Sequence, residues 1–274
     1  MSHATAPTLT IDAGAIRFAY RRLGPAEGIP LLFLQHFTGT MDSWDPTLVD
    51  ELARDRPVLL FNNTGVGTSS GATPDTVEQM TSEALSFIEA LALPTLDLMG
   101  FSLGGMIALD LASRRPDLVR RIIVAGAAPR GGEEHLMAVV EDAFSKGADD
   151  VRLPLFFTPS AASQAAGAAF VARALARVTD RDPDSGDAIA GAQAKAIIGW
   201  CAADDGGAML RSIGQPALVV HGSDDTMFPS INAYSMFKAM PDAQLILYPD
   251  AGHGALFQYA DIFAAHARLF LERS

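Results

Sequence analysis

A serine between two glycines is the clearest candidate for a reacting group in this chain. Ser102 lies in Gly100-Phe101-Ser102-Leu103-Gly104, which matches the pattern GxSxG. A serine hydroxyl attacks a carbonyl carbon only when a neighbouring imidazole takes its proton and a carboxylate holds that imidazole in the correct tautomer. The pattern therefore predicts a nucleophilic serine whose histidine and acid lie elsewhere in the chain.

His253 is the best candidate for the base. It follows a predicted strand, precedes the last predicted helix and is flanked by glycines, which favours an exposed loop. His3 lies near the start of the chain, His135 follows a Gly-Gly pair and His221 ends an apolar strand, so none of them has this context. We expect His266 to be a packed residue of the last helix rather than a ligand.

Two adjacent aspartates are candidates for the acid. Asp224 and Asp225 follow the predicted strand 217–221 and precede His253. The reacting groups then occur in the order serine, acid and base, which is one of the known orders for such triads. The order alone does not separate the two aspartates.

Short apolar runs alternate with helical patterns, which predicts an α/β fold with a mostly parallel sheet and helices on both faces. Antiparallel pairing is expected only for the first two strands. A helix predicted at 103–114 follows the fifth strand, so Ser102 lies in a sharp turn at a helix N-terminus. The eight predicted strands are 8–11, 16–22, 30–35, 57–62, 95–99, 119–125, 217–221 and 244–248.

The long interval between the sixth and seventh strands predicts an insertion. It is rich in Ala and Gly and has helical apolar spacing, so we interpret residues 131–211 as a helical cap on a core domain made of residues 1–130 and 212–274. Such a cap would roof the nucleophile and favour apolar substrates, unless its apolar residues pack only its own interior. These residues are Leu153, Leu155, Phe156, Phe157, Ile197, Ile198 and Trp200.

These features resemble the α/β-hydrolase superfamily, and within it the group of small carboxylesterases, cofactor-free haloperoxidases and carbon-carbon bond hydrolases. Acid loops of the family read GxxDxxxP, which matches Gly222, Asp225 and Pro229. The resemblance therefore implies that Asp225 is the acid and that Asp224 is a turn residue. Relatives with an aspartate nucleophile, such as epoxide hydrolases, are disfavoured by Ser102.

The resemblance also implies an oxyanion hole. The family usually has His-Gly-Phe before a Ser-Trp pair, and here Gln35-His36-Phe37 stands in that place. It implies oxyanion donors at the backbone amides of Phe37 and Leu103. His36 replaces the usual glycine and either points into the site or has a structural role.

A second family segment, DxRGxGxS, corresponds to residues 62–69 of this chain. Asn62 and Thr64 replace its charged Asp and Arg. We expect neutral hydrogen bonds to take over the bracing role of the missing ion pair.

Composition limits the partners. The formal charge of −12 disfavours nucleic acid and anionic lipid. No apolar run reaches the roughly 18 residues of a membrane span and no leader pattern is present, so we expect a cytoplasmic protein. The single cysteine, Cys201, is expected to be a buried apolar residue. No clustered ligands imply a metal or an organic cofactor, and nothing in the sequence indicates an oligomeric state.

The sequence therefore predicts a hydrolase that cleaves a small or medium carboxylic ester, or a related acyl bond, through an acyl-enzyme. Carbon-carbon bond hydrolysis and perhydrolysis by a haloperoxidase-like enzyme use the same triad and remain open, and a small-ligand receptor of this fold is a further alternative. Candidate pocket residues are His36, Trp44, Phe101, Phe157, Trp200 and Met227.

Overall fold

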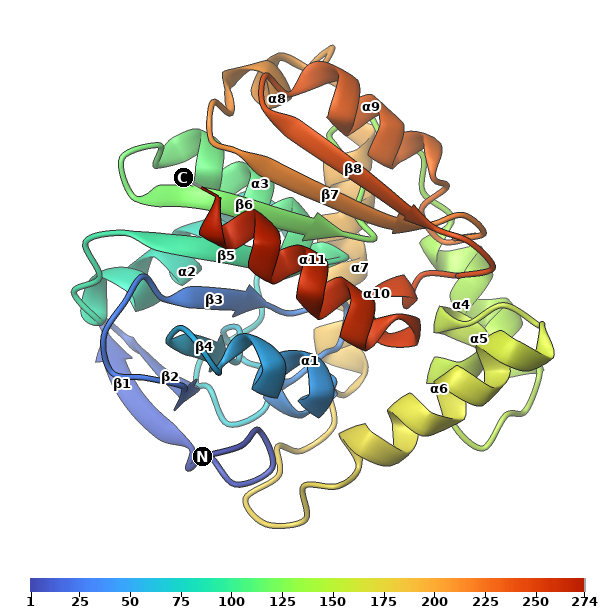
Figure 1. The fold of residues 1–274 in the computed structure, drawn as a ribbon, viewed down its shortest axis with the longest axis horizontal. Coiled ribbons are helices and arrows are strands. Elements are labelled where there is room, and N and C mark those ends of the chain that lie inside the picture. The colour runs from blue at the N-terminus through green and yellow to red at the C-terminus, as the bar shows by residue number, and fades with distance from the viewer. Residues whose placement is uncertain (274) are drawn as a thin grey trace.

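Eight strands form one sheet in the computed structural model, which describes residues 1–273 (Figure 1). Their spatial order is β1-β2-β4-β3-β5-β6-β7-β8. Only β2 pairs antiparallel, with β1 and β4, and all other neighbours are parallel. The predicted mostly parallel eight-stranded sheet is confirmed. The strands are β1 Leu9–Ala13, β2 Ile16–Leu23, β3 Leu31–Leu34, β4 Val58–Phe61, β5 Leu96–Phe101, β6 Val119–Ala125, β7 Ala217–Gly222 and β8 Ala243–Tyr248.

The central strands are apolar throughout because both faces of the sheet are buried. Along β3, Leu31 and Phe33 belong to one hydrophobic cluster, whereas Leu32 and Leu34 belong to another. Successive side chains of a strand point to opposite faces, so a strand between two layers of helices needs an apolar residue at every position. This explains why the buried strands could be recognised as continuous apolar runs.

Helices cover both faces of the sheet, as predicted. Helices α1 and α11 pack together on one face, and the neighbouring pairs α2 with α3, α3 with α8, and α8 with α9 cover the other (Figure 1). The helices are α1 Pro46–Leu52, α2 Val77–Ala90, α3 Leu103–Arg114, α4 Leu136–Ser145, α5 Arg152–Phe156, α6 Ala161–Ala174, α7 Asp187–Ala202, α8 Ala208–Ser212, α9 Ile231–Ala239, α10 Ala255–Gln258 and α11 Ala260–Glu272, with the 3-10 helix η1 Met41–Ser43.

The end of the chain differs from the expected single helix. Its helical segment is divided at Tyr259 into α10 and α11. The spacing of the apolar residues predicts a face that includes Ile262, Phe263, Leu269 and Phe270, but Ile262 and Leu269 are exposed. The buried side of α11 is centred on Phe263, Ala267 and Phe270, about 100° around the helix from the two exposed residues.

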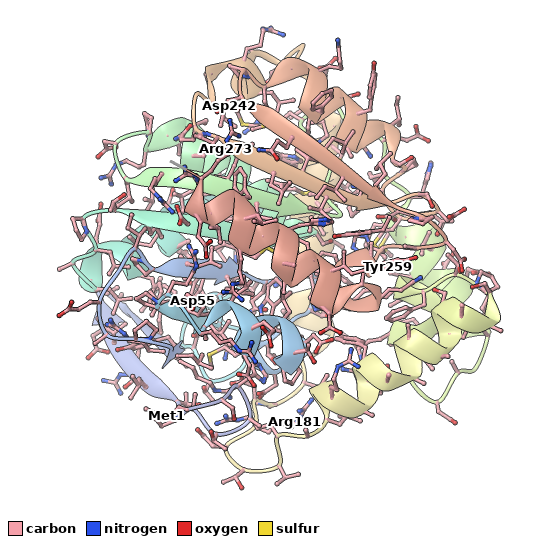
Figure 2. All side chains as sticks on the ribbon, viewed as in Figure 1. Met1, Asp55, Arg181, Asp242, Tyr259 and Arg273 are labelled. Atoms are coloured by element: carbon pink, nitrogen blue, oxygen red, sulfur yellow. The ribbon has the colours of Figure 1, made fainter. Side chains whose placement is uncertain are left out.

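Salt bridges also connect α11 to neighbouring elements. Arg273, just beyond its end, lies 3.7 Å from Asp242, just ahead of β8 (Figure 2). Arg268 pairs with Asp55, which follows α1. Because these groups are partly exposed, each pair contributes little to stability.

Helices α4 to α8 are inserted between β6 and β7. Figure 1 shows α4, α5 and α6 beyond the carboxyl ends of the central strands, where parallel α/β sheets bind ligands. Helix α7 contacts α2 and α3, and α8 contacts α3 and α9. None of the helices within residues 1–273 combines the length and the apolar character needed to cross a membrane.

Candidate active site

Ser102 occupies a strained turn between β5 and α3. Its backbone has φ 56° and ψ −120°, a conformation that side-chain-bearing residues rarely adopt. The turn ends the strand and starts the helix within one residue, so Ser102 is the N-cap residue of α3. Such strain persists only where the surrounding structure enforces it, and it occurs most often at functional sites.

The glycines of the GxSxG pattern allow the close packing that holds this turn. A Cβ atom on Gly100 would lie 2.2 Å from the carbonyl oxygen of Gly104. A Cβ atom on Gly104 would lie 1.9 Å from the carbonyl oxygen of Leu34, at the end of β3. Both approaches are to backbone atoms, so neither can be relieved by moving a side chain. A side chain at either glycine position would therefore prevent this approach of strand and helix.

Asp225 and His253 come together as a pair. Asp225 lies in the loop after β7 and His253 in the loop between β8 and α10, and His253 Nδ1 lies 2.9 Å from Asp225 Oδ2. Gly222 lets the two loops meet, because a Cβ atom there would lie 2.2 Å from the carbonyl oxygens of Ala251 and Gly252. Asp224 is instead exposed and bonds to the neighbouring Ser223 hydroxyl.

Three N–H groups donate to the Asp225 carboxylate, and His221 Nε2, which is bonded to the carbonyl oxygen of Phe228 at 2.6 Å, also lies close to it. The amides of Met227 and Phe228 donate to Oδ1 at 2.9 and 3.0 Å, whereas His253 and His221 approach Oδ2 at 2.9 and 3.2 Å. Burial by itself would raise the pKa of Asp225, but the charge of His253 and the contacts with both histidines outweigh it and hold the pKa well below its usual range. The acid is therefore a fixed, ionised acceptor.

The imidazole of His253 lies beside the serine turn. Its ring centroid is 4.9 Å from that of Phe101, the residue before Ser102. A Cβ atom on Gly126, just after β6, would lie 3.3 Å from His253 Cε1. Ser102 Oγ is buried and has no hydrogen-bond partner among residues 1–273. The candidate nucleophile Ser102 is therefore not hydrogen bonded to the candidate base His253 in the structure.

Two backbone amides, those of Leu103 and Phe37, are the candidate oxyanion donors. The Leu103 amide begins α3, where the first amides have no partner inside the helix. Among the described residues, Phe37 N–H also makes no hydrogen bond. The oxyanion role that the resemblance implies for both amides stays a prediction; Leu103 begins the helix after β5 and Phe37 lies in the loop after β3, and these two strands are adjacent and parallel.

His36 lies against the aromatic residues of the site. Its ring is 5.2 Å from that of Phe101 and 5.5 Å from that of Phe156. Nδ1 donates to the carbonyl oxygen of Phe37 at 2.9 Å, which leaves Nε2 as a buried acceptor without a partner. Burial lowers the pKa of His36 to about 4, and the charges of His253 and Arg152 act in the same direction. His36 is therefore neutral at physiological pH.

Phe156, at the end of α5, covers the site. Its carbonyl oxygen accepts a hydrogen bond from Gly254 N–H at 2.8 Å, and its ring lies 5.8 Å from the ring of His253. Only 1% of Ser102 and 3% of His253 are exposed. A substrate therefore reaches the serine only after some of the covering side chains move.

A family model described as "alpha/beta hydrolase fold" matches residues 29–259, a range that contains the serine turn and both partner loops. The chain belongs to the α/β-hydrolase fold family. This confirms the resemblance inferred from the motifs.

Known relatives agree with this assignment. "Putative carbamate hydrolase RutD" of Agrobacterium fabrum is 27% identical over 260 residues, which cover 90% of this chain and 94% of the relative. The pimeloyl-[acyl-carrier protein] methyl ester esterase of Nitrosomonas europaea is 26% identical, over 87% of this chain and 94% of the relative. The solved structure of an α/β-hydrolase fold protein from Chitinophaga pinensis is 41% identical, with a TM-score of 0.92 and full coverage of both chains. The protein is a hydrolase.

The remaining candidate pocket residues of this α/β-hydrolase lie at different distances from the triad. Trp44 packs against Phe33 with ring centroids 4.8 Å apart and lies behind Phe101. Met227 borders the acid through its amide. Phe157 faces Phe170 in the insertion, whereas the neighbouring Phe156 contacts His253.

Trp200 has a bracing role within the fold. It donates to the carbonyl oxygen of Ala128 at 3.0 Å, and the Arg130 guanidinium lies over its ring. Cys201 beside it is buried, as expected, and burial raises the pKa of its thiol to about 12. Ile198, one of the apolar residues expected on the inner face of the insertion, is instead exposed on the outer side of α7. Trp200 thus supports the packing of α7 on the core.

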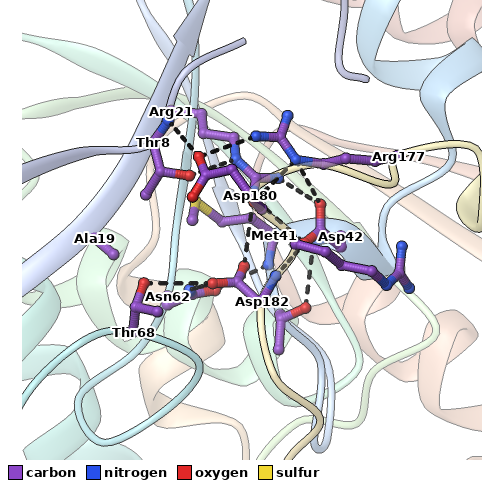
Figure 3. Close-up of polar contacts among 12 residues, drawn as sticks. Thr8, Ala19, Arg21, Met41, Asp42, Asn62, Thr68, Arg177, Asp180 and Asp182 are labelled. Atoms are coloured by element: carbon purple, nitrogen blue, oxygen red, sulfur yellow. Dashed lines mark hydrogen bonds and ion pairs between the residues drawn. The ribbon is translucent and has the colours of Figure 1, made fainter. Parts of the chain in front are cut away.

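A buried polar cluster takes the place of the ion pair that the α/β-hydrolase segment 62–69 lacks (Figure 3). Asn62 accepts a hydrogen bond from the Met41 amide at 2.9 Å and donates to Asp182 Oδ1 at 2.8 Å. Arg21 forms a buried ion pair with Asp42. The expected neutral hydrogen bonds are present, but one of the partners is a charged residue of the insertion.

This cluster ties the connection between α6 and α7 to the core. The amide of Asp182 donates to Asp42 Oδ2 at 2.7 Å, and Arg177 donates to the carbonyl oxygens of His3 and Ala6 at 3.1 and 2.9 Å. Burial and the nearby charge of Asp42 raise the pKa of Asp182 above its usual range. The insertion is thus anchored at this point by hydrogen bonds as well as by packing.

Three contributions to the site were not assigned from the sequence. His221 Nε2 lies 3.2 Å from Asp225 Oδ2 although it ends an apolar strand, and Phe156 rather than Phe157 contacts His253. Gln193, on α7, accepts a hydrogen bond from the Thr38 amide beside the oxyanion loop. Only His221 could have been inferred from the sequence, because a residue at the carboxyl end of a strand and four positions before Asp225 is expected to lie near that carboxylate. The other two depend on how the insertion docks.

Proposed function

We propose that this hydrolase is a serine esterase that cleaves a small or medium carboxylic ester, or a related acyl bond, through a covalent acyl-enzyme on Ser102. The observation that carries the proposal is the pairing of His253 with Asp225 beside the strained serine turn. A buried carboxylate at 2.9 Å holds the proton on Nδ1, which leaves Nε2 unprotonated and able to act as a base.

The proposed reaction begins when a substrate carbonyl reaches Ser102. The hydroxyl oxygen attacks the carbonyl carbon while His253 Nε2 takes its proton, and the resulting imidazolium is stabilised by Asp225. The amides of Leu103 and Phe37 donate to the developing oxyanion. Protonation of the leaving group by His253 then releases the alcohol and leaves an acyl group on the serine.

The second half of the reaction reverses these roles. Water attacks the acyl carbon, His253 accepts a proton from that water, and the same amides stabilise the second oxyanion. Return of the proton to Ser102 releases the acid and restores the resting enzyme. No charged group other than the triad is needed for either half.

Aromatic side chains around the triad favour a substrate with a compact apolar acyl group. Phe101 and Phe156 pack against His253, and Phe257 lies against both of these phenylalanines. Ser102 is almost completely buried, and we propose that the inserted helices, which bring Phe156 against Phe101 and His253, act as the cap. A covered apolar site excludes water and long polymers, and the net charge of −12 opposes strongly anionic substrates.

Turnover of p-nitrophenyl acetate, butyrate and palmitate tests the proposal. We expect the short esters to be hydrolysed faster than palmitate, and Ser102→Ala to lower kcat by about 10⁴-fold or more. Ser113→Ala, a substitution at the far end of the same helix, is the matched control and should keep wild-type turnover. Equal rates for Ser102→Ala and wild type would refute the proposal.

Other outcomes of the same experiment identify the alternatives. Bromination of a dye that depends on hydrogen peroxide and a short carboxylic acid would indicate perhydrolysis, and cleavage of a diketone in place of the esters would indicate carbon-carbon bond hydrolysis. Binding without turnover of any of these compounds would indicate a receptor.

A further inference from the structure

Thr38, the residue after the proposed oxyanion donor Phe37, has an unusual backbone conformation. Its φ is 58°, in the left-handed region that β-branched residues strongly disfavour. Such a conformation persists only when its surroundings hold it in place. Thr38 is therefore a point at which the shape of the oxyanion loop depends on outside contacts.

Two residues of the insertion supply those contacts. Gln193 Oε1, on α7, accepts a hydrogen bond from Thr38 N–H at 2.6 Å. Ser185 Oγ, just before α7, donates to the carbonyl oxygen of Thr38 at 2.9 Å. Both backbone polar groups of Thr38 are thus bonded to the same inserted segment rather than to the core.

These bonds fix the peptide unit that follows Phe37. Its carbonyl oxygen accepts from His36 Nδ1 at 2.9 Å and from the Thr38 hydroxyl at 2.7 Å, and its N–H donates to Gln193. Peptide units are planar, so holding one unit at both ends restricts the torsions of the residue before it. The direction of Phe37 N–H is set by those torsions.

Gln193 is placed by burial and by the anchoring of the segment before it. Its side chain is completely buried, and the Thr38 amide is its hydrogen-bond partner, since its Nε2 has none among the described residues. The segment before α7 is anchored to the core by Asp182, through Asn62 and Asp42. A buried amide on an anchored segment therefore meets a strained loop residue.

We infer that Gln193 is a positioning residue that assembles the oxyanion hole when the insertion is docked on the core. Without its acceptor, Thr38 relaxes toward negative φ and turns the Phe37 amide away from the oxyanion position. The inference rests on the proposed serine chemistry. It adds a structural reason why the enzyme is reactive only when the insertion is docked on the core. Substrate binding before the reaction does not need the oxyanion donor, whereas the transition state does.

Gln193→Met tests the inference, because methionine keeps the length and burial of the side chain but removes the acceptor. We expect kcat for p-nitrophenyl butyrate to fall about ten- to hundred-fold, somewhat less than the cost of deleting an oxyanion donor. KM should stay within about two-fold of wild type, and affinity for a trifluoromethyl ketone, which forms an oxyanion on the serine, should fall by the same factor as kcat. Lys195→Met, which removes a surface ion pair between α7 and Asp75, is the matched control and should change none of these values.

Two results would overturn the inference. One is unchanged kcat and ketone affinity in Gln193→Met, and the other is a rise in KM alone, which would make Gln193 a substrate contact. If Gln193→Met does not fold, as judged by its thermal unfolding, Ser185→Ala replaces it, because Ser185 holds the other side of Thr38 and is only partly buried. Wild-type kcat together with wild-type ketone affinity in a folded Ser185→Ala would then decide against the inference.

The rate at which a fluorophosphonate labels Ser102 separates this inference from the proposed function. The phosphoryl oxygen of this probe occupies the oxyanion hole whichever ester is the natural substrate. Labelling that is slowed about ten-fold or more in Gln193→Met supports the inference even if no ester is hydrolysed. Wild-type labelling together with wild-type ester hydrolysis in the variant would contradict the inference alone.

Discussion

Replacing Asp225 with asparagine is the most informative change to the proposed triad. Oδ1 of Asp225 accepts two backbone amides, from Met227 and Phe228, whereas Oδ2 faces His253 Nδ1 and His221 Nε2. In Asp225→Asn the remaining oxygen must stay with the two amides, because a buried N–H without an acceptor is costly. The new NH₂ group is thereby forced toward His253.

The consequence is a change of tautomer. His253 can pair with an NH₂ group only through an unprotonated Nδ1, which moves its proton to Nε2 and removes the base that Ser102 needs. The imidazolium also loses its stabilising charge. In comparable triads the same change lowers kcat by about 10⁴-fold, which corresponds to about 5 kcal/mol of transition-state stabilisation.

Steady-state hydrolysis of p-nitrophenyl butyrate at pH 7.5 measures this effect. Asp224→Asn is the matched control, since the Asp224 side chain is exposed and bonds only to its neighbour Ser223 among the described residues, and we expect the variant to keep kcat within about two-fold. A loss smaller than about ten-fold in Asp225→Asn, or an equal loss in Asp224→Asn, would refute the tautomer argument. Near-wild-type unfolding in urea would show that the loss is not a folding defect.

Three further substitutions test the packing and electrostatics of the site. Gly104→Ala should abolish ester hydrolysis and lower stability, because its Cβ would lie 1.9 Å from the carbonyl oxygen of Leu34. His36→Gln should flatten the dependence of stability on pH. The pKa of His36 is lowered to about 4, so its contribution is complete above the unfolded value of about 6.5 and is lost as the pH falls toward 4, by up to about 3 kcal/mol. Arg21→Met should cost roughly 3–5 kcal/mol in urea unfolding, because it leaves the buried Asp42 carboxylate without its main ion-pair partner.

Each of these expectations has a clear contrary result. An active, stable Gly104→Ala would mean that the strand and helix do not approach as closely as the structure shows. Equal slopes of stability against pH for His36→Gln and wild type between pH 4 and 6.5 would mean that His36 is not buried as a neutral group. Less than about 1 kcal/mol lost in Arg21→Met would mean that the cluster is solvated.

The sequence was sufficient for those parts of the molecule that depend on local patterns. The buried strands were visible as apolar runs because both faces of the sheet are covered, and the serine turn was visible because its glycines are sterically required. The candidate base, His253, was predicted from its glycine-flanked loop. The choice of Asp225 over Asp224 as candidate acid needed the family resemblance, and in the structure it is Asp225 that lies beside His253.

Features that depend on docking could not be read in the same way. Gln193 and Phe156 meet the site only because the insertion folds back onto the core, and no short-range pattern marks a residue for such a contact. The last helix buries the side that carries Phe263 and Phe270, so Ile262 and Leu269 are exposed although their spacing also suited a buried face. Apolar spacing predicts a helix reliably but not its exact phase.

The most direct test of the central claim is rapid-quench mass spectrometry during turnover of p-nitrophenyl butyrate. Because p-nitrophenolate leaves readily, acylation should outpace deacylation and the acyl-enzyme should accumulate within the first turnover. The account predicts a butyryl group on the peptide that carries Ser102, formed with the burst of p-nitrophenolate and absent from Ser102→Ala. A butyryl group on another residue, or steady turnover by wild type with no covalent adduct at any time, would contradict it.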